Sequence, residues 1–200
     1  QPIPEDIKKN NLNGILVASP ANPTGSMVDK ETLKNLINTA HENNVSFISD
    51  EIYHGIQYEN NPTTALEITD KCYVINSFSK YFSMTGWRIG WMIVPEDHVR
   101  QVERLSQNLF ICPPHVSQLT ALSAMDANIE LNENVNVYKK NREILLEELP
   151  KAGLGKFSPP DGAFYIYVDI SKYSNDSLNF CKEVLNKACL LYTSDAADDL

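Results

Sequence analysis

Short apolar runs alternate with a helix-like segment in the first part of the chain. Mostly apolar residues occupy 14–17, 45–49 and 73–76, and polar or turn-forming residues follow each run. Such runs are typical of strands buried in a parallel sheet. Between the first two runs, 29–43 carries leucine, isoleucine and alanine at helical spacing. The pattern predicts a βαβ unit, and therefore an α/β fold.

Further elements follow along the chain. Residues 90–94 indicate a fourth strand, and apolar positions at helical spacing predict a helix over 96–108. Pro113 and Pro114 favour the start of another helix that runs to Met125. These helices are expected to cover the sheet.

The pattern changes after residue 125. A polar stretch over 126–136 indicates a domain boundary, and the helix that continues to Leu149 is expected to bridge two domains. Residues 158–162 predict a turn, the aromatic-rich segment 163–169 predicts a strand, and 178–188 predicts a helix. We therefore expect part of a large domain over 1–127, and a linker helix with part of a smaller C-terminal domain over 128–189.

The two ends of the chain suggest a fragment. Gln1 is not a methionine and stands in what looks like the middle of a domain. Residues 190–200 resemble a translated sequencing adapter, so we expect a non-native tail and leave it out of the fold prediction. A genuine acidic C-terminus is the alternative.

Composition excludes some classes of partner. The 26 acidic and 17 basic residues give a net charge of −9, or −6 without the three aspartates of the tail. This balance disfavours nucleic acid and anionic membranes, and the apolar runs are too short to cross a bilayer. The four cysteines show neither metal-ligand spacing nor a dense disulfide framework. We expect free thiols and a cytoplasmic protein that binds no metal.

The strongest chemical signal follows the third strand. Ser77-Phe78-Ser79-Lys80 is followed by Gly86, Arg88 and Gly90. The lysine supplies an amine that can condense with an aldehyde, and the hydroxyls and guanidinium can grip phosphate oxygens. The glycines allow a tight turn or a close approach to a ligand. This set of groups fits a phosphorylated aldehyde such as pyridoxal phosphate.

Two other strand ends carry polar groups. The loop after the first strand contains Asn22-Pro23-Thr24-Gly25, and Asp50 and Tyr53 follow the second strand. Ligands of α/β proteins bind where strands end. Each group alone has an ordinary interpretation: Asn-Pro starts turns, an aspartate caps helices, and a half-buried tyrosine bonds a backbone group. The joint pattern carries the inference.

In order and interval, these motifs resemble the fold-type I pyridoxal-phosphate enzymes, and among them the class I/II aminotransferases. The similarity covers about residues 14–188. It implies a mostly parallel sheet covered by helices, with part of a smaller α+β C-terminal domain. It also makes the fourth strand antiparallel, and predicts a cis peptide bond between Asn22 and Pro23.

The resemblance implies a role for each motif residue. Lys80 would bond to the cofactor aldehyde and later carry a proton. Asp50 would pair with the protonated pyridine nitrogen, and Tyr53 and Asn22 would bind the ring's phenolic oxygen. The phosphate would be held by Ser77, Ser79 and Arg88.

Two residues are candidates for substrate binding. By the same resemblance, Asn22 would also contact the substrate carboxylate. Tyr165, in the aromatic segment, is a substrate-contact candidate whose alternative is packing beneath the following helix.

The implied function is an aminotransferase that moves an amino group between an L-amino acid and a 2-oxo acid. The alternatives are a C–S β-lyase or related synthase, and the aminotransferase-like sensor domain of a transcription regulator. Family members are usually homodimers with shared sites. We therefore expect residues 1–200 alone to be inactive.

Overall fold

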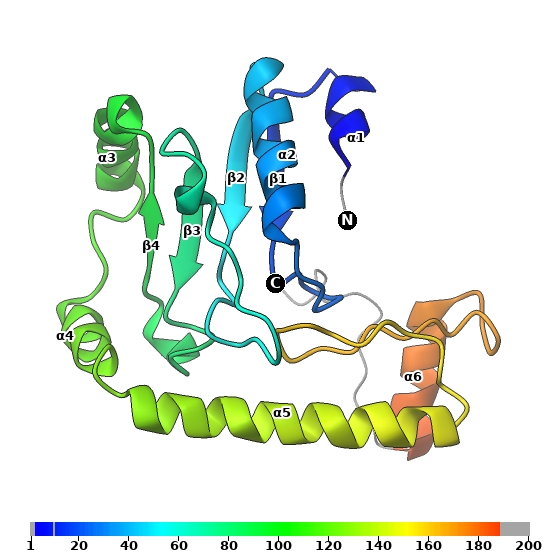
Figure 1. Ribbon diagram of the computed structural model, residues 1–200. Helices are drawn as coiled ribbons and strands as arrows, with labels where there is room; N and C mark the ends of the chain where they lie inside the picture. The colour runs from blue at the N-terminus through cyan, green and yellow to red at the C-terminus, as the bar shows by residue number, and fades with distance from the viewer. Residues whose placement is uncertain (1–2, 10, 189–200) are drawn as a thin grey trace.

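A four-stranded sheet forms the centre of the fold in the computed structural model, which describes residues 3–9 and 11–188. The strands are β1 (Gly14–Ala18), β2 (Ser46–Asp50), β3 (Tyr73–Ser77) and β4 (Gly90–Ile93), in that spatial order (Figure 1). The first three are parallel to one another, and β4 is antiparallel to β3. The four strands predicted within residues 14–94 and their directions are confirmed.

Six α-helices are described around this sheet: α1 (Pro4–Lys9), α2 (Lys30–Glu42), α3 (Val99–Leu109), α4 (His115–Ala124), α5 (Asn128–Lys151) and α6 (Ser177–Ala188). Short 3-10 helices occupy Ala65–Glu67, Thr85–Trp87 and Glu96–His98. The sequence prediction missed α1. The predicted tail and Cys189 lie outside the described residues.

Local chemistry explains the start of α2. The Asp29 side chain accepts hydrogen bonds from the backbone N–H and the hydroxyl of Thr32, at 2.9 and 2.6 Å. This is an N-cap, which satisfies a donor that the first turn leaves unpaired. The predicted helix therefore begins where the sequence places a capping residue.

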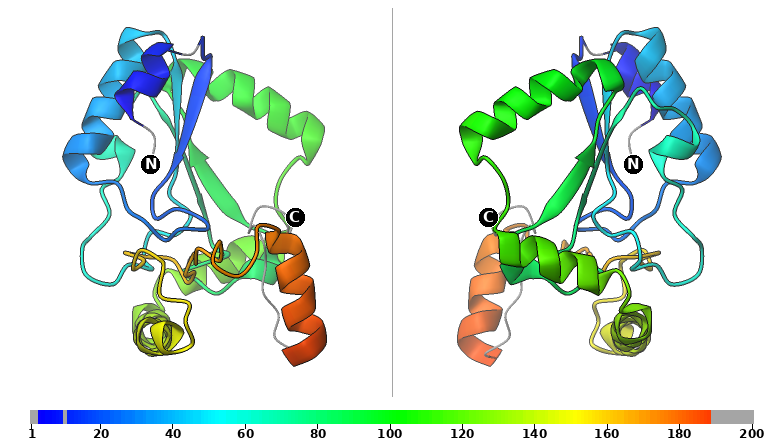
Figure 2. Two further views of the ribbon diagram at one scale, coloured as in Figure 1. Left: turned by 90° about the vertical axis from the view of Figure 1, so that its right-hand side faces the viewer. Right: turned by 90° about the vertical axis from the view of Figure 1, so that its left-hand side faces the viewer.

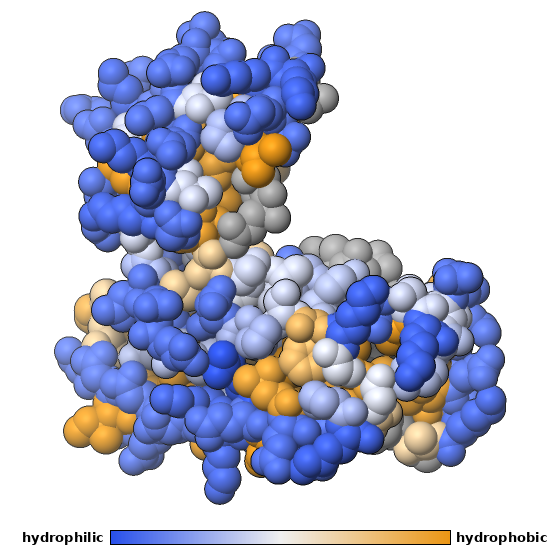
Figure 3. All heavy atoms as spheres, turned by 45° about the vertical axis from the view of Figure 1, so that its right-hand side comes forward, coloured by the Kyte–Doolittle hydropathy of each residue, from blue (hydrophilic) through white to orange (hydrophobic). Residues whose placement is uncertain are grey.

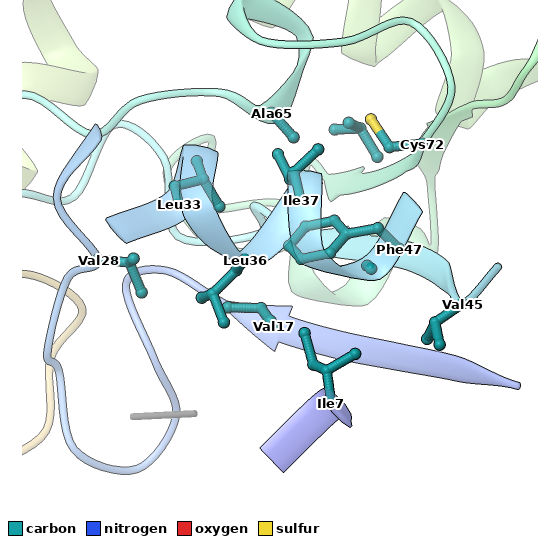
Figure 4. Close-up of a cluster of buried hydrophobic side chains, with 12 residues drawn as sticks. Ile7, Val17, Val28, Leu33, Leu36, Ile37, Val45, Phe47, Ala65 and Cys72 are labelled. Atoms are coloured by element: carbon teal, nitrogen blue, oxygen red, sulfur yellow. The ribbon is translucent and has the colours of Figure 1, made fainter. Parts of the chain in front are cut away.

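The main hydrophobic core lies between α2 and the sheet (Figure 4). Leu36 and Ile37 of α2 are fully buried against Phe47 of β2, which is 1% exposed. The cluster also takes in Ile7 of α1 and Val17 of β1. Helix α2 thus covers one face of the sheet because its apolar stripe matches the inward positions of the strands.

Truncation of the central aromatic of this core should be costly. Phe47→Ala is expected to lower the free energy of unfolding by about 3–5 kcal/mol, since it leaves a cavity between α2 and β2. Urea unfolding followed by circular dichroism measures the change. Phe110→Ala is the control, because that ring is 59% exposed and should lose far less. Equal losses in the two variants would contradict this placement of the core.

The opposite face of the sheet is covered less closely. Figure 2 shows α1 and α2 on one face and α3 on the other. A groove of about 1040 Å³ separates α3 from β3 and β4, and Trp91, Ile93 and Phe110 help to line it. Leu16 of β1 is 58% exposed. Within the described residues, only the first face has a closed core.

The second half of the chain is built on the long helix α5, which lies beneath the sheet in Figure 1. Apolar side chains from α5, α6 and the connecting segment line a second groove, and such side chains are visible in the lower part of Figure 3. The predicted strand over 163–169 is wrong. Only the isolated pairs Gln57–Gly162 and Phe157–Val168 form, because no neighbouring strand among the described residues continues either ladder.

No helix among the described residues is both long and apolar enough to span a membrane.

Candidate active site

The sheet brings three chain segments to one edge. Ala18, Asp50 and Ile75 are neighbours in register across β1, β2 and β3. Because these strands are parallel, the loops that follow them leave from the same edge. The Asn22 loop, the turn with Tyr53 and the Ser77–Lys80 segment therefore start side by side, as the sequence pattern predicts.

The segment after β3 folds into a closed loop. Ser77 pairs with Gly90, and the backbone N–H of Phe78 donates to Ile89 O at 3.1 Å. Ser77 Oγ lies 2.9 Å from Ser79 Oγ and accepts the backbone N–H of Ser79 at 3.0 Å. The two hydroxyls predicted to bind phosphate are thus in contact with each other at the end of β3.

Arg88 lies on the return side of this loop. Its backbone has a φ of 51°, in the left-handed region, and its side chain is exposed. Nη1 donates to Thr85 O at 3.1 Å, while Thr85 Oγ1 donates to Ser79 O at 2.7 Å. Thr85 therefore links the guanidinium to the serine pair, a connection that the sequence analysis did not find.

The two glycines of the motif serve different purposes. A Cβ on Gly90 would lie 2.6 Å from Asn76 O, so this glycine permits β4 to approach β3 closely. A Cβ on Gly86 would meet nothing within 4 Å. The close approach at Gly90 is therefore to β3, and the predicted approach to a ligand stays a prediction.

The side chain of Lys80 points into a group of aromatic rings. Its Nζ lies 5.4 Å from the ring centroid of Tyr53 and 5.6 Å from that of Phe164. Tyr53 is 2% exposed, and its hydroxyl lies 2.6 Å from the hydroxyl of Tyr165. The structure thus brings Lys80, Tyr53 and Tyr165 together. The alternative of a backbone partner for the Tyr53 hydroxyl is wrong.

Phe164 is a site residue that the sequence analysis missed. Its ring packs at 5.5 Å from Tyr53 and at 4.9 Å from Tyr165. Ala163, just before it, has a φ of 59° and is fully buried. The signal available in the sequence was its position next to Tyr165, which was already a substrate-contact candidate.

Burial is the largest of the causes that raise the pKa of the Tyr53 hydroxyl. The hydroxyl of Tyr165 and the charge of Asp50 raise it further. The phenol should therefore stay protonated at pH values where an exposed tyrosine ionises, near 10. As the pH rises above 10, the unfolded chain loses this proton first, so stability should fall.

The measurement is the phenolate absorbance between pH 9 and 12, in the wild type and in Tyr53→Phe. The two titration curves should coincide up to about pH 11, since Tyr53 contributes no phenolate there. A step near pH 10 that disappears in Tyr53→Phe would contradict the burial of this hydroxyl. Tyr167→Phe is the control for removal of a phenol from an exposed position, because Tyr167 is 52% exposed.

Asp50 ends β2 beside this group. Its Oδ1 accepts the backbone N–H of Ile52 at 3.1 Å, so the carboxylate supports a turn. The alternative role as a helix N-cap is wrong, because the next residues form turns. One carboxylate thus lies at the sheet edge, next to the turn that carries Tyr53.

Asn22 is exposed on the loop after β1. The predicted cis bond between Asn22 and Pro23 is confirmed, and Ser19–Pro20 is also cis. The carbonyl of Gly25 accepts the backbone N–H groups of Asp161 and Gly162, both at 2.9 Å. The Asn22 loop is therefore tied to the segment that carries Phe164 and Tyr165.

This set of groups fits pyridoxal phosphate. An amine lies close to two aromatic rings, a carboxylate stands at the adjacent strand end, and the hydroxyls of Ser77 and Ser79 lie together at the end of β3. Amine, carboxylate and phosphate-binding hydroxyls are the groups that this cofactor requires. The fit rests on the chemistry of these groups and on their position at the same edge of the sheet, where the parallel strands end.

A model of class I and II aminotransferases matches residues 3–195. The chain belongs to this family. A curated valine–pyruvate aminotransferase from Mycobacterium tuberculosis is 44% identical over 87% of this chain and 46% of its own length. An aspartate aminotransferase from Thermotoga maritima is 33% identical over 92% of this chain and 48% of its own.

Solved structures agree with this membership. A structure from Silicibacter pomeroyi, of a protein assigned as an aminotransferase, matches with a TM-score of 0.93 and 59% identity over 96% of this chain and 52% of that one. A Mycobacterium tuberculosis aminotransferase matches with a TM-score of 0.91 and 41% identity, over 96% of this chain and 51% of that one. The α/β fold of this family is confirmed. The chain spans about half the length of the curated relatives that it matches.

Proposed function

We propose that the protein containing this chain is a pyridoxal-phosphate-dependent aminotransferase that moves an amino group between an L-amino acid and a 2-oxo acid. The observation that carries the proposal is the position of Lys80, whose amine lies against Tyr53 and Phe164 at the strand edge of a class I and II aminotransferase fold. A lysine in this setting is placed to react with an aldehyde.

The cofactor would be held from three strand ends. Lys80 would bond to it, while Ser77, Ser79 and Arg88 would bind its phosphate. Asp50 would face the pyridine nitrogen. This assignment uses residues on one edge of the sheet, which supports a single site rather than scattered charges.

When bound, pyridoxal phosphate supplies an aldehyde that bonds to amines and a ring that accepts electrons from the substrate Cα. The chain's own groups handle the protons. Lys80 Nζ would carry the proton between the substrate Cα and the cofactor C4′. Asp50 would keep the ring nitrogen protonated, and Tyr53 and Asn22 would orient the ring through its phenolic oxygen. Tyr165, bonded to Tyr53, would position the substrate.

The proposal also covers domains, partners and location. We assign 1–127 to a large cofactor-binding domain and 128–189 to a linker helix with part of a small domain. The natural protein would form a homodimer, as is usual in this family. A cytoplasmic location is supported by the free thiols of Cys72, Cys112 and Cys181.

Analysis of a half-reaction tests this function. The natural full-length protein, loaded with pyridoxal phosphate, is supplied with valine or aspartate without an oxo acid acceptor. Stoichiometric release of the matching 2-oxo acid, with the amino group retained on the cofactor, is expected. Release of ammonia with pyruvate from a sulfur amino acid would instead indicate a β-lyase. Cofactor binding without any amino transfer would favour the sensor domain.

A further inference from the structure

A second carboxyl group, that of Glu51, directly follows Asp50 in the chain. Glu51 is only 4% exposed. Its Oε1 accepts hydrogen bonds from Ser49 Oγ at 3.1 Å, Thr64 Oγ1 at 3.0 Å and the backbone N–H of Ala65 at 2.8 Å. A buried carboxyl with this many partners is fixed in position.

His54 lies between Glu51 and the loop after β1. Its Nδ1 is 3.4 Å from Glu51 Oε2, and its Nε2 is 3.0 Å from the carbonyl oxygen of Ser19. Both ring nitrogens thus face oxygen acceptors. A neutral imidazole carries only one N–H, so beside a carboxylate it can donate to only one of these two acceptors. One additional proton is needed to satisfy both contacts.

The surroundings disfavour a permanent cation on the ring. Burial lowers the pKa of His54, against the opposing effects of the Glu51 charge, the Ser19 carbonyl and Asp50. Cys72 lies near Glu51 as well, and its own pKa is raised to about 11, chiefly by burial. The titratable groups facing the pair are therefore Asp50 and Cys72. One proton between Glu51 Oε2 and His54 Nδ1, with the N–H of Nε2 directed to Ser19 O, satisfies both contacts and leaves the pair neutral overall.

Ser19 is the residue through which this pair could affect the site. Its N–H donates to Asp50 O at 3.2 Å, and its Oγ accepts the N–H of Val28 at 2.9 Å. The loop between these two bonds carries Asn22. His54 adds a third link at the Ser19 carbonyl, so the start of the loop is fixed relative to the turn that carries Tyr53.

We propose that Glu51 and His54 are positioning residues that share one proton between Oε2 and Nδ1, and thereby hold the Asn22 loop in place beside Asp50 and Tyr53. The role toward the cofactor rests on the proposed function. The structural part, a proton-dependent link between the two loops, stands on the contacts of the pair.

Three variants separate these contributions. Glu51→Gln supplies an amide oxygen for the three donors and an N–H for Nδ1, so it reproduces the link without the shared proton. His54→Phe removes both contacts of the ring. His41→Phe is the matched control, because His41 also contacts a backbone carbonyl, that of Lys71 at 3.1 Å, but on the end of α2.

Amide hydrogen exchange provides a readout that needs no cofactor. The N–H groups of Ala21, Gly25 and Val28 are bonded within the loop. In His54→Phe they should exchange about 10-fold faster or more, and in Glu51→Gln and His41→Phe they should keep wild-type rates. Nitrogen NMR of the wild type should find His54 Nδ1 shifted from the position of a bare ring nitrogen toward that of a protonated one.

Cofactor affinity of the natural full-length protein is the second readout. His54→Phe should weaken pyridoxal phosphate binding by about 10-fold or more, with wild-type affinity retained in Glu51→Gln. A bare Nδ1 in the wild type would overturn the shared proton. This measurement is made on the wild type alone, so it does not depend on whether a variant folds. Unchanged exchange and unchanged affinity in His54→Phe would overturn the positioning role. A wild type that never bonds the cofactor would refute the proposed function, while the exchange result would still decide the link between the loops.

Discussion

Lys80→Ala is expected to abolish covalent attachment of pyridoxal phosphate and to reduce amino transfer to background. The amine that lies against Tyr53 and Phe164 is the group that bonds the cofactor and then moves the substrate proton, so both tasks are lost together. Some cofactor should still bind through Arg88 and the two serines. Borohydride reduction followed by mass spectrometry of the natural full-length protein measures the attachment, and equilibrium dialysis measures the residual binding.

Lys34→Ala is the matched control for this experiment. Lys34 is exposed on α2, away from the strand edge, and its loss should leave attachment and turnover unchanged. Reduced cofactor found on a lysine other than Lys80 would refute the assignment. So would wild-type turnover in Lys80→Ala.

Asp50→Asn is expected to lower turnover by about 10²–10³-fold while the protein stays folded. The carboxylate stands at the end of β2, and an amide of the same shape can still accept the backbone N–H of Ile52. It lacks the negative charge that would keep the ring nitrogen protonated. Loss of one group that stabilises developing charge typically has an effect of this size. Steady-state kinetics of the natural full-length protein, with unfolding curves in parallel, test this expectation.

Asp97→Asn provides the comparison, because Asp97 is an exposed carboxylate near the start of α3. It should keep wild-type turnover. If Asp50→Asn loses less than about 3-fold, the carboxylate does not support the ring nitrogen, since the expected loss is far larger. If it loses turnover and stability together, the role of Asp50 lies in the turn at Ile52.

Much of the site could be predicted because its chemistry is local in sequence. Ser77 ends one strand with Ser79 and Lys80 just after it, and Asp50 ends another. Identifying the strands therefore places these residues at one edge of the sheet. The contact between Tyr53 and Tyr165 is different, since the two residues are 112 positions apart. A contact between residues so far apart leaves no periodic pattern in the sequence that could predict it.

The wrong prediction of a strand over 163–169 has a similar cause. The segment over 163–169 has the aromatic composition of a strand, yet a strand exists only where a neighbour completes its hydrogen bonds. Within the segment only Val168 forms an isolated pair, with Phe157, and the turn at Ala163 directs Phe164 toward Lys80. The aromatic composition indicated a preference for the strand conformation, but the segment has no neighbouring strand among the described residues with which to form it.

The sequence alone determined the order of β1 to β4 and of α2 to α6, because burial of apolar runs and amphipathic faces follows from local spacing. It also determined which groups could bind and react, through the motifs around Asn22, Asp50 and Lys80. Only the tertiary structure decided that Phe164 and Tyr165 meet Lys80 and Tyr53, and that His54 links Glu51 to Ser19. Such contacts depend on how distant segments pack together, and packing is a property of the whole fold.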